Sequence, residues 1–135
     1  MALNLIKLCV GCDTVEELLE WRRSEGDADP WIMRTRQTPK RADELVQAGS
    51  LYRVFKGFVL SRQRILRVET VGSGPASRCE VTLDPDVVLT QPMPRRPFQG
   101  WRYLEGKDAP ADLHRLGDDS VPQPLALRLR ELGAW

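Results

Sequence analysis

The grouping of strand-like segments in the middle of the sequence constrains the fold most. Apolar patterns of strand type, separated by turns rich in glycine, proline and aspartate, predict a series of short strands. The expected strands cover residues 3–10, 31–36, 51–56, 58–70, 79–83, 87–90 and 101–104. Because most of them follow one another instead of alternating with helices, the sequence favours an α+β fold over a doubly wound sheet. Many short strands must manage their edges, so we expect a small, strongly bent mixed sheet or a β-barrel flanked by short helices.

Four helices are expected around this sheet. The first begins near Asp13 or Thr14, each of which has a glutamate three residues later that completes a capping box. The second ends at Gly49, because glycine is common just after a helix. The expected helices cover residues 14–24, 40–48, 108–116 and 124–132. No internal repeat and no long linker divides the sequence, so residues 1–135 are predicted to form a single domain.

Three segments of the expected sheet carry special features. The apolar residues of segment 3–10 occupy both phases, which predicts a strand buried on both faces. In segment 58–70, Arg62 and Arg64 interrupt the apolar phase, which predicts a bulge or a point where the strand leaves the core. Three prolines predict an extended, irregular course for residues 92–97.

The composition indicates a globular protein that folds without disulfide bonds. The chain has 135 residues, of which 41% are hydrophobic and 29% are charged, a balance typical of one globular domain. No apolar run approaches the roughly 18 residues that a membrane span needs, and residues 1–10 show no signal-peptide cleavage site. The three cysteines, an odd number, argue against a disulfide framework and favour a reducing compartment, so we expect a cytoplasmic protein.

The net charge of +1 hides an uneven distribution of charge. Residues 34–102 hold 13 basic against 6 acidic residues, a net charge of +7. The flanking residues 1–33 (3 basic, 7 acidic) and 103–135 (4 basic, 6 acidic) have net charges of −4 and −2. This asymmetry favours an anionic partner, and RNA or another polyanion is expected.

Several basic side chains of the middle segment are expected on strand faces. Alternation places Arg34 and Arg36 on one face and Arg62 and Arg64 on another, and neighbouring strands would bring them onto one surface. Arginine forks bind phosphate groups in a bidentate manner, and Gln63 is expected to contact a base or a sugar. The alternative is a solvated sheet face that binds nothing. The phosphate-binding candidates in this region are Arg36, Lys40, Arg41, Lys56, Arg62, Gln63 and Arg64.

A second candidate lies in residues 94–103, where arginines alternate with aromatic residues. This composition is typical of single-stranded nucleic-acid sites, in which bases stack on aromatic rings and phosphates pair with arginine. It is also typical of protein-interface hot spots, and a third interpretation places the rings in the core. The binding candidates here are Arg95, Arg96, Phe98 and Trp101.

The cysteines and the single histidine give less support for catalysis. Cys9 and Cys12 form a C-x-x-C motif between a strand and a helix, a pattern shared by redox sites and by one half of a zinc site. A complete zinc site would need Cys79 and His114 to converge with them, so structural cysteines are the favoured interpretation. His114 is expected on a surface helix rather than as a general base. No nucleophile–base set and no phosphate-binding glycine loop is recognised, and no catalytic residue, metal or cofactor is predicted.

Motifs near the N-terminus, in the middle and near residue 100 carry a family resemblance. They are LIKLCVG at residues 5–11, the spaced residues Thr35-Arg36, Pro39-Lys40-Arg41, Gly49–Tyr52, Lys56-Gly57 and Arg62–Ile65, and RRPFQGWRYL at 95–104. The chain resembles an uncharacterised alphaproteobacterial family, the domain of unknown function numbered 1489. The resemblance covers nearly the whole chain and implies a bacterial cytoplasmic protein, but it supplies no activity and no catalytic residues. A more distant likeness to the PUA and ASCH group of small β-barrels implies a fold that commonly binds RNA or modified nucleotides.

Together these features predict a nucleic-acid-binding module, for RNA more than for DNA, that uses the arginine-rich sheet face and the aromatic–arginine loop. One alternative is an enzyme or binding protein for a small anionic ligand, such as a nucleotide or a sugar phosphate, in a pocket lined by the same arginines. The other is a protein-interaction subunit that uses the loop of residues 95–103. A broad basic surface favours nucleic acid, a deep pocket favours a small ligand, and a large exposed apolar patch favours a protein partner.

Overall fold

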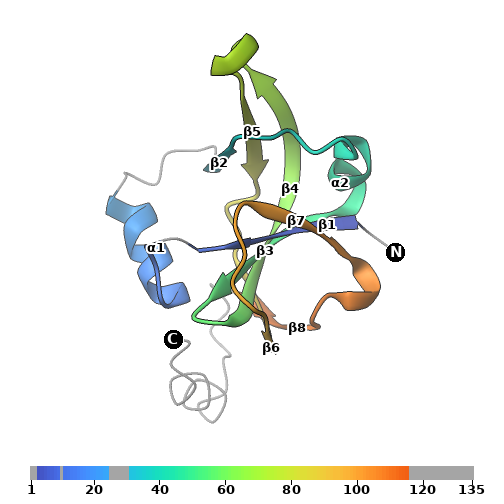
Figure 1. Ribbon diagram of the computed structural model, residues 1–135. Coiled ribbons are helices and arrows are strands. Elements are labelled where there is room, and N and C mark those ends of the chain that lie inside the picture. Colours follow the sequence, from blue (N-terminus) through green and yellow to red (C-terminus); the bar gives the residue numbers. More distant parts are fainter. Residues whose placement is uncertain (1–2, 10, 25–30, 116–135) are drawn as a thin grey trace.

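A computed structural model describes residues 3–9, 11–24 and 31–115 of the chain (Figure 1). Its α-helices are α1 (Val15–Ser24) and α2 (Ala42–Ala48), and its 3₁₀ turns are η1 (Gly74–Ala76) and η2 (Gly106–Asp108). Its strands are β1 (Leu3–Leu8), β2 (Trp31–Thr35), β3 (Ser50–Phe55), β4 (Phe58–Val71), β5 (Arg78–Leu83), β6 (Val88–Pro94), β7 (Trp101–Glu105) and β8 (Asp112–Arg115). This content confirms the predicted α+β class. Neither described helix is long and apolar enough to cross a membrane.

The eight described strands form one mixed sheet. Their order is β2-β5-β4-β3-β1-β7, and β6 pairs with β4 on one side and with β8 on the other. The β1–β3 pair is parallel, while the other six pairs among the described strands are antiparallel. No pairing between β2 and β7 closes the path within the described residues, so the expected barrel is not confirmed.

The longest strand, β4, links two parts of the sheet. Its first half pairs with β3 and β6, and its second half pairs with β5, with which it runs up to the hairpin at the top of Figure 1. The register with β5 shifts between Ile65 and Arg67. Ile65 is fully buried, whereas Leu66 at the shift is 50% exposed. The sequence predicted a bulge in this strand, and the register shift confirms it.

The core lies on both faces of the central strands. Leu5 and Leu51, which pair across β1 and β3, enter the main core together with Leu45 of α2. Ile6, the next residue of β1, enters a smaller cluster with Tyr52 on the opposite face. β1 is therefore buried on both faces, as expected for a strand whose apolar residues occupy both phases.

Gly49 joins the end of α2 to β1 and β4. Its N–H donates to the carbonyl oxygen of Leu45 at 2.8 Å, and its own carbonyl oxygen accepts from the N–H of Ile65 at 2.9 Å. A Cβ atom at this position would lie 2.6 Å from the oxygen of Leu45 and nearer still to the carbonyl oxygen of Leu3. Glycine is required here by close packing of backbone against backbone.

The helix expected over residues 108–116 is wrong. The turn η2 is followed by β8, which pairs with β6 in antiparallel register. Pro110 disfavours helical backbone at Ala109, and pairing with a distant strand satisfies the backbone polar groups that a helix would otherwise satisfy. His114 is consequently a strand residue and does not lie on a helix. The helix expected over residues 124–132 lies outside the described residues.

The proline-rich segment 92–97 is more regular than expected. β6 continues through Pro94 and pairs there with Phe58 of β4. The register between β6 and β8 ends at Thr90, so the outer part of β6 has one edge without a described partner. Proline, which lacks an N–H group, is tolerated at such an edge.

Candidate functional site

Two arginines flank the ring of Phe98, which lies on the segment that joins β6 to β7, and a third arginine lies beside them. The guanidinium carbons of Arg95 and Arg102 lie 5.9 Å and 5.5 Å from the centroid of the Phe98 ring. Arg96 is exposed beside them, and the group lines a shallow hollow of about 550 Å³. None of the three arginines forms an ion pair with a described carboxylate. Their positive charges are therefore not neutralised within the described part of the protein.

Trp101 and Tyr103 of β7 contact a second basic segment, residues 36–41. Their rings pack edge to face, with centroids 5.0 Å apart. Trp101 Nε1–H donates to the carbonyl oxygen of Gln37 at 3.0 Å, and the backbone N–H of Arg41 donates to the Tyr103 hydroxyl at 3.1 Å. The guanidinium of Arg41 also lies 5.6 Å from the centre of the Tyr103 ring. The segment that carries Arg36, Lys40 and Arg41 is thus fixed against β7.

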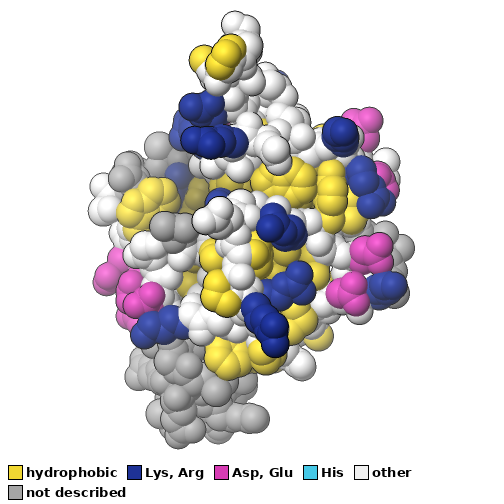
Figure 2. Space-filling model, viewed as in Figure 1, with side chains coloured by type: hydrophobic (Ala, Val, Ile, Leu, Met, Phe, Trp, Pro, Cys, Tyr) yellow, Lys and Arg dark blue, Asp and Glu magenta, His cyan; other side chains and the backbone are white. Residues whose placement is uncertain are grey.

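We call these residues together the β7 face, in which Trp101 and Tyr103 pack against the main core and Phe98 packs against the smaller cluster on the other side of the sheet. It consists of Arg36, Lys40, Arg41, Arg95, Arg96, Phe98, Trp101, Arg102 and Tyr103. Figure 2 shows basic side chains among hydrophobic ones over the region where β6 and β7 lie in front. Arg41 is bound to Glu44, and the hydrogen bond from Arg41 holds the pKa of Glu44 below its usual value. The other cations of the face have no described carboxylate partner.

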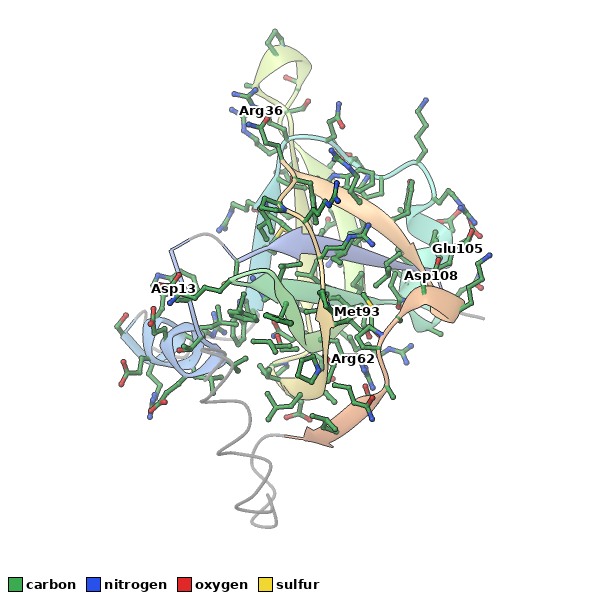
Figure 3. All side chains as sticks on the ribbon, turned by 60° about the horizontal axis from the view of Figure 1, so that its bottom comes forward. Asp13, Arg36, Arg62, Met93, Glu105 and Asp108 are labelled. Carbon is green, nitrogen blue, oxygen red and sulfur yellow. The ribbon has the colours of Figure 1, made fainter. Side chains whose placement is uncertain are left out.

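The remaining predicted site residues lie elsewhere. Arg62 donates to both carboxylate oxygens of Asp112, at 2.7 Å and 2.6 Å, and these hydrogen bonds raise the pKa of Arg62. Arg64 donates to the carbonyl oxygen of Gln47 at 3.0 Å, and Lys56 lies 3.8 Å from Asp13. Figure 3 shows Arg36 near the top of the view and Arg62 well below it. The two pairs of strand arginines do not share one surface.

Gln63 is part of the interior. Its side chain is 1% exposed, its amide nitrogen donates to the carbonyl oxygen of Asp84 at 3.0 Å, and its amide oxygen accepts from Arg53 at 3.3 Å. A base or sugar cannot reach this amide without displacing the core. We therefore exclude Gln63 from the candidate interface.

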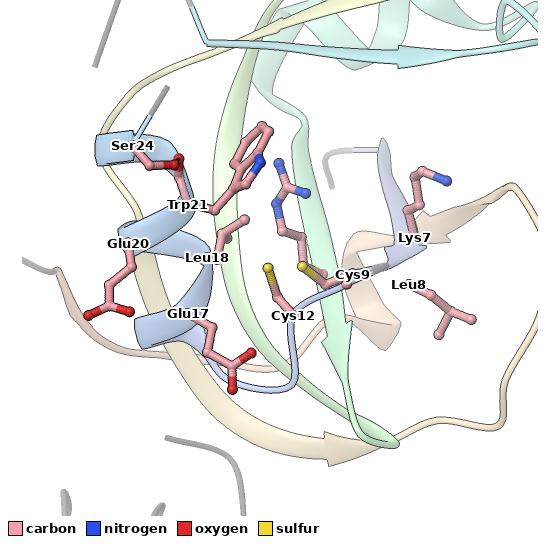
Figure 4. A pocket seen from close by; sticks show the side chains of 11 residues that line it. Lys7, Leu8, Cys9, Cys12, Glu17, Leu18, Glu20, Trp21 and Ser24 are labelled. Carbon is pink, nitrogen blue, oxygen red and sulfur yellow. Dashed lines mark hydrogen bonds between the residues drawn. The ribbon is translucent and has the colours of Figure 1, made fainter. Parts of the chain in front are cut away.

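The C-x-x-C cysteines line a separate pocket between α1 and the ends of β1 and β3. This pocket has a volume of about 680 Å³, and we call it the α1 pocket. Figure 4 shows Cys9 and Cys12 side by side, with Leu18 and Trp21 projecting from α1 toward them. Burial raises the pKa of the Cys9 thiol to about 12, which disfavours the thiolate form at neutral pH. The cysteines are free, and Cys79 is buried on β5.

No zinc site is formed by the described residues, because they contain no group of three metal-ligating side chains. The structure places three further residues at a site, although they were not among the predicted site residues. Arg102 and Tyr103 belong to the β7 face, and the aromatic–arginine motif of residues 94–103 already contained them. Arg53 lines the α1 pocket, and the signal was one charged residue within the otherwise apolar strand segment 51–55.

Comparison with known proteins identifies a family and no activity. The chain belongs to the protein family of unknown function DUF1489, whose model matches residues 5–135. No curated protein and no solved structure matches the chain.

Proposed function

We propose that this member of the DUF1489 family is a nucleic-acid-binding protein that takes single-stranded RNA on the β7 face. The observation on which this proposal rests is that Arg95 and Arg102 flank Phe98, that Arg96 lines the same hollow, and that no described carboxylate neutralises the three arginines. A face with several arginines that no carboxylate neutralises attracts a polyanion. An aromatic ring among them favours unpaired bases over a closed duplex.

Each part of the face has a distinct role in this proposal. Phe98 stacks on a base, while Arg95 and Arg102, which flank the ring, pair with the phosphates on either side of that base. Arg36 and Lys40 extend the path along the second basic segment, which Trp101 and Tyr103 hold in place. The prolines at positions 94 and 97 stiffen the backbone around Phe98, so less conformational entropy is lost when the ligand binds.

The fold is consistent with this proposal by analogy. We propose that this open, bent sheet is a distant relative of the PUA and ASCH type of small β-barrel, folds that commonly bind RNA or modified nucleotides. We also propose that the protein acts in the bacterial cytoplasm, where RNA is available and free thiols such as Cys9 and Cys12 stay reduced.

Fluorescence anisotropy with labelled single-stranded RNA, duplex RNA and duplex DNA tests the proposal. We expect the tightest binding to single-stranded RNA, with an affinity that falls steeply as salt rises. The double variant R95A/R102A should weaken binding and flatten the plot of log affinity against log salt by about 1.4, because each lost single-strand phosphate contact removes about 0.7 from the slope. The variant R23A/R67A removes the same charge from α1 and β4 and serves as the matched control.

Equal loss of affinity in both double variants would mean that only the net charge matters, and it would remove the β7 face from the proposal. Absence of binding to all three nucleic acids at low salt would overturn the function itself. Binding of duplex RNA in preference to single strands would remove the stacking role of Phe98.

A further inference from the structure

A buried arginine without a carboxylate partner lies in the α1 pocket. Arg53 is 8% exposed, although it sits on β3 among apolar neighbours. No ion pair joins it to a described carboxylate. A buried charge is costly to keep unless an opposite charge or several hydrogen bonds compensate it. The position therefore calls for an anion that the described residues do not supply.

The neighbours of Arg53 hold its guanidinium in a fixed orientation. Its Nε–H donates to Gln63 Oε1 at 3.3 Å, and Gln63 is itself anchored to the carbonyl oxygen of Asp84. Its guanidinium carbon lies 5.7 Å from the centre of the buried Trp31 ring. Cys9 provides only a weak sulfur acceptor on the pocket side. Most of the guanidinium donors thus remain available on the side that lines the pocket.

The rest of the pocket combines an apolar wall with a second cation. Leu18 is buried, and Trp21 is 49% exposed although it is a large aromatic residue. Lys7, which pairs with Arg53 across β1 and β3, also lines the pocket. The carboxylates of Glu17 and Glu20 belong to the rim, and Figure 4 shows Glu20 pointing outward from α1. The interior is therefore cationic at the floor and apolar at the wall.

We propose that the α1 pocket binds a small organic oxyanion, a carboxylate or a phosphate monoester, whose oxygens pair with Arg53 and whose apolar part packs on Trp21 and Leu18. The volume of about 680 Å³ lies within the range of small-molecule sites, roughly 300–1,000 Å³. A planar guanidinium fork matches the two oxygens of a carboxylate or phosphate. The exposed acidic rim disfavours long polyanions. This site shares no residue with the β7 face, so its existence does not depend on RNA binding.

Burial lowers the pKa of Arg53. Arginine nonetheless stays charged at any physiological pH. The pocket therefore keeps a permanent positive charge that a bound anion would stabilise.

The test uses benzoate as the carboxylate probe, phenyl phosphate as the phosphate monoester probe and benzamide as the neutral control, at constant ionic strength. Two signals report binding to the full-length protein: the fluorescence of Trp21, identified by its loss in W21F, and the rate at which a disulfide reagent modifies Cys12. We expect one or both anions to change the fluorescence and to slow the modification, whereas benzamide changes neither. The anion that binds more tightly indicates whether the natural ligand carries a carboxylate or a phosphate group.

The variant R53M should weaken binding of the active probe at least about thirty-fold, as loss of a buried charge pair does. R67M, an exposed arginine of β4 away from the pocket, is the matched control and should bind as the wild type. R53K keeps the charge but loses the fork, and it should bind with intermediate affinity. If R53M fails to fold by circular dichroism, the R53K result decides the role of the fork.

Two results would overturn the proposal. One is that neither anion alters Trp21 fluorescence or Cys12 modification at millimolar concentration. The other is that R53M is folded but markedly less stable than the wild type in the absence of any probe. Methionine has a similar shape and should be tolerated where a charge lacks compensation, so a large loss would mean that the chain itself neutralises Arg53.

Discussion

Substitution of Gly49 by alanine should destabilise the protein through a clash between backbone groups. The backbone angles of Gly49 (φ −81°, ψ 160°) suit any residue, so the effect cannot come from a strained dihedral. The new Cβ would lie 2.6 Å from the carbonyl oxygen of Leu45 and would also meet the carbonyl oxygen of Leu3. Neither oxygen belongs to a side chain that can rotate away. Relief therefore requires α2 to move away from β1.

The magnitude follows from two opposing effects. Overpacking of a tight site costs about 1–3 kcal/mol, and backbone contacts place this site near the upper end of that range. Alanine reduces the entropy of the unfolded chain and returns about 0.4–1 kcal/mol. The net loss is about 2 kcal/mol, and it should lower the melting temperature by about 5–10 °C in a domain of this size.

Urea unfolding followed by tryptophan fluorescence measures this loss. A lower midpoint with an unchanged slope would confirm that the native state alone is affected. Gly100→Ala is the comparison, because Gly100 has φ +70° and open space around its Cβ position, so its cost comes from the dihedral alone. A stability of Gly49→Ala within about 0.5 kcal/mol of the wild type would refute the close approach of α2 to β1.

Three further outcomes are expected. Phe98→Ala should weaken single-stranded RNA binding about 5- to 100-fold, as loss of one stacking ring does, whereas Phe98→Tyr should bind as the wild type does. Equal binding by the wild type and both variants in anisotropy titrations would contradict the stacking role. Burial raises the pKa of Cys9 to about 12 from an ordinary value of 9.0. The unfolded state therefore loses this proton first, and the free energy of unfolding should fall as the pH rises above about 9. Cys9→Ala should flatten that pH dependence in urea titrations at pH 8 to 10.5. Asp112→Ala removes the bidentate partner of Arg62 and should lower the free energy of unfolding by about 1 kcal/mol, with faster amide hydrogen exchange in β8. Unchanged exchange would show that the ion pair does not hold this strand in place.

Much of the fold was accessible from the sequence because its signals are local. Alternating apolar residues located β3, β4 and β5, and the glutamates after Asp13 and Thr14 located the start of α1. The interruption of the apolar phase by Arg62 and Arg64 also located the irregularity of β4. β8 was missed because its pairing with β6 is a long-range interaction, and only its local helix preference was visible in the sequence.

The candidate site was partly predictable for the same reason. The compact motif of residues 94–103 kept its arginines and aromatic rings together, since they are neighbours along the chain. Arg62 could not be assigned correctly, because its partner Asp112 lies fifty residues away. Gln63 was expected to contact a base or a sugar and is instead buried, because its hydrogen bond with Arg53 depends on the register of β3 against β4.

The position of β1 between β3 and β7 also determines when the protein can finish folding. Leu3 pairs with Glu105, so one edge of β1 remains without its partner until β7 has left the ribosome during synthesis. The other edge can pair earlier, once β3 is available. A nascent chain that holds an apolar strand with a free edge is open to wrong pairing with other chains. Folding of this protein should therefore be slow for its size, and its yield in cells should depend on how quickly translation proceeds from β3 to β7.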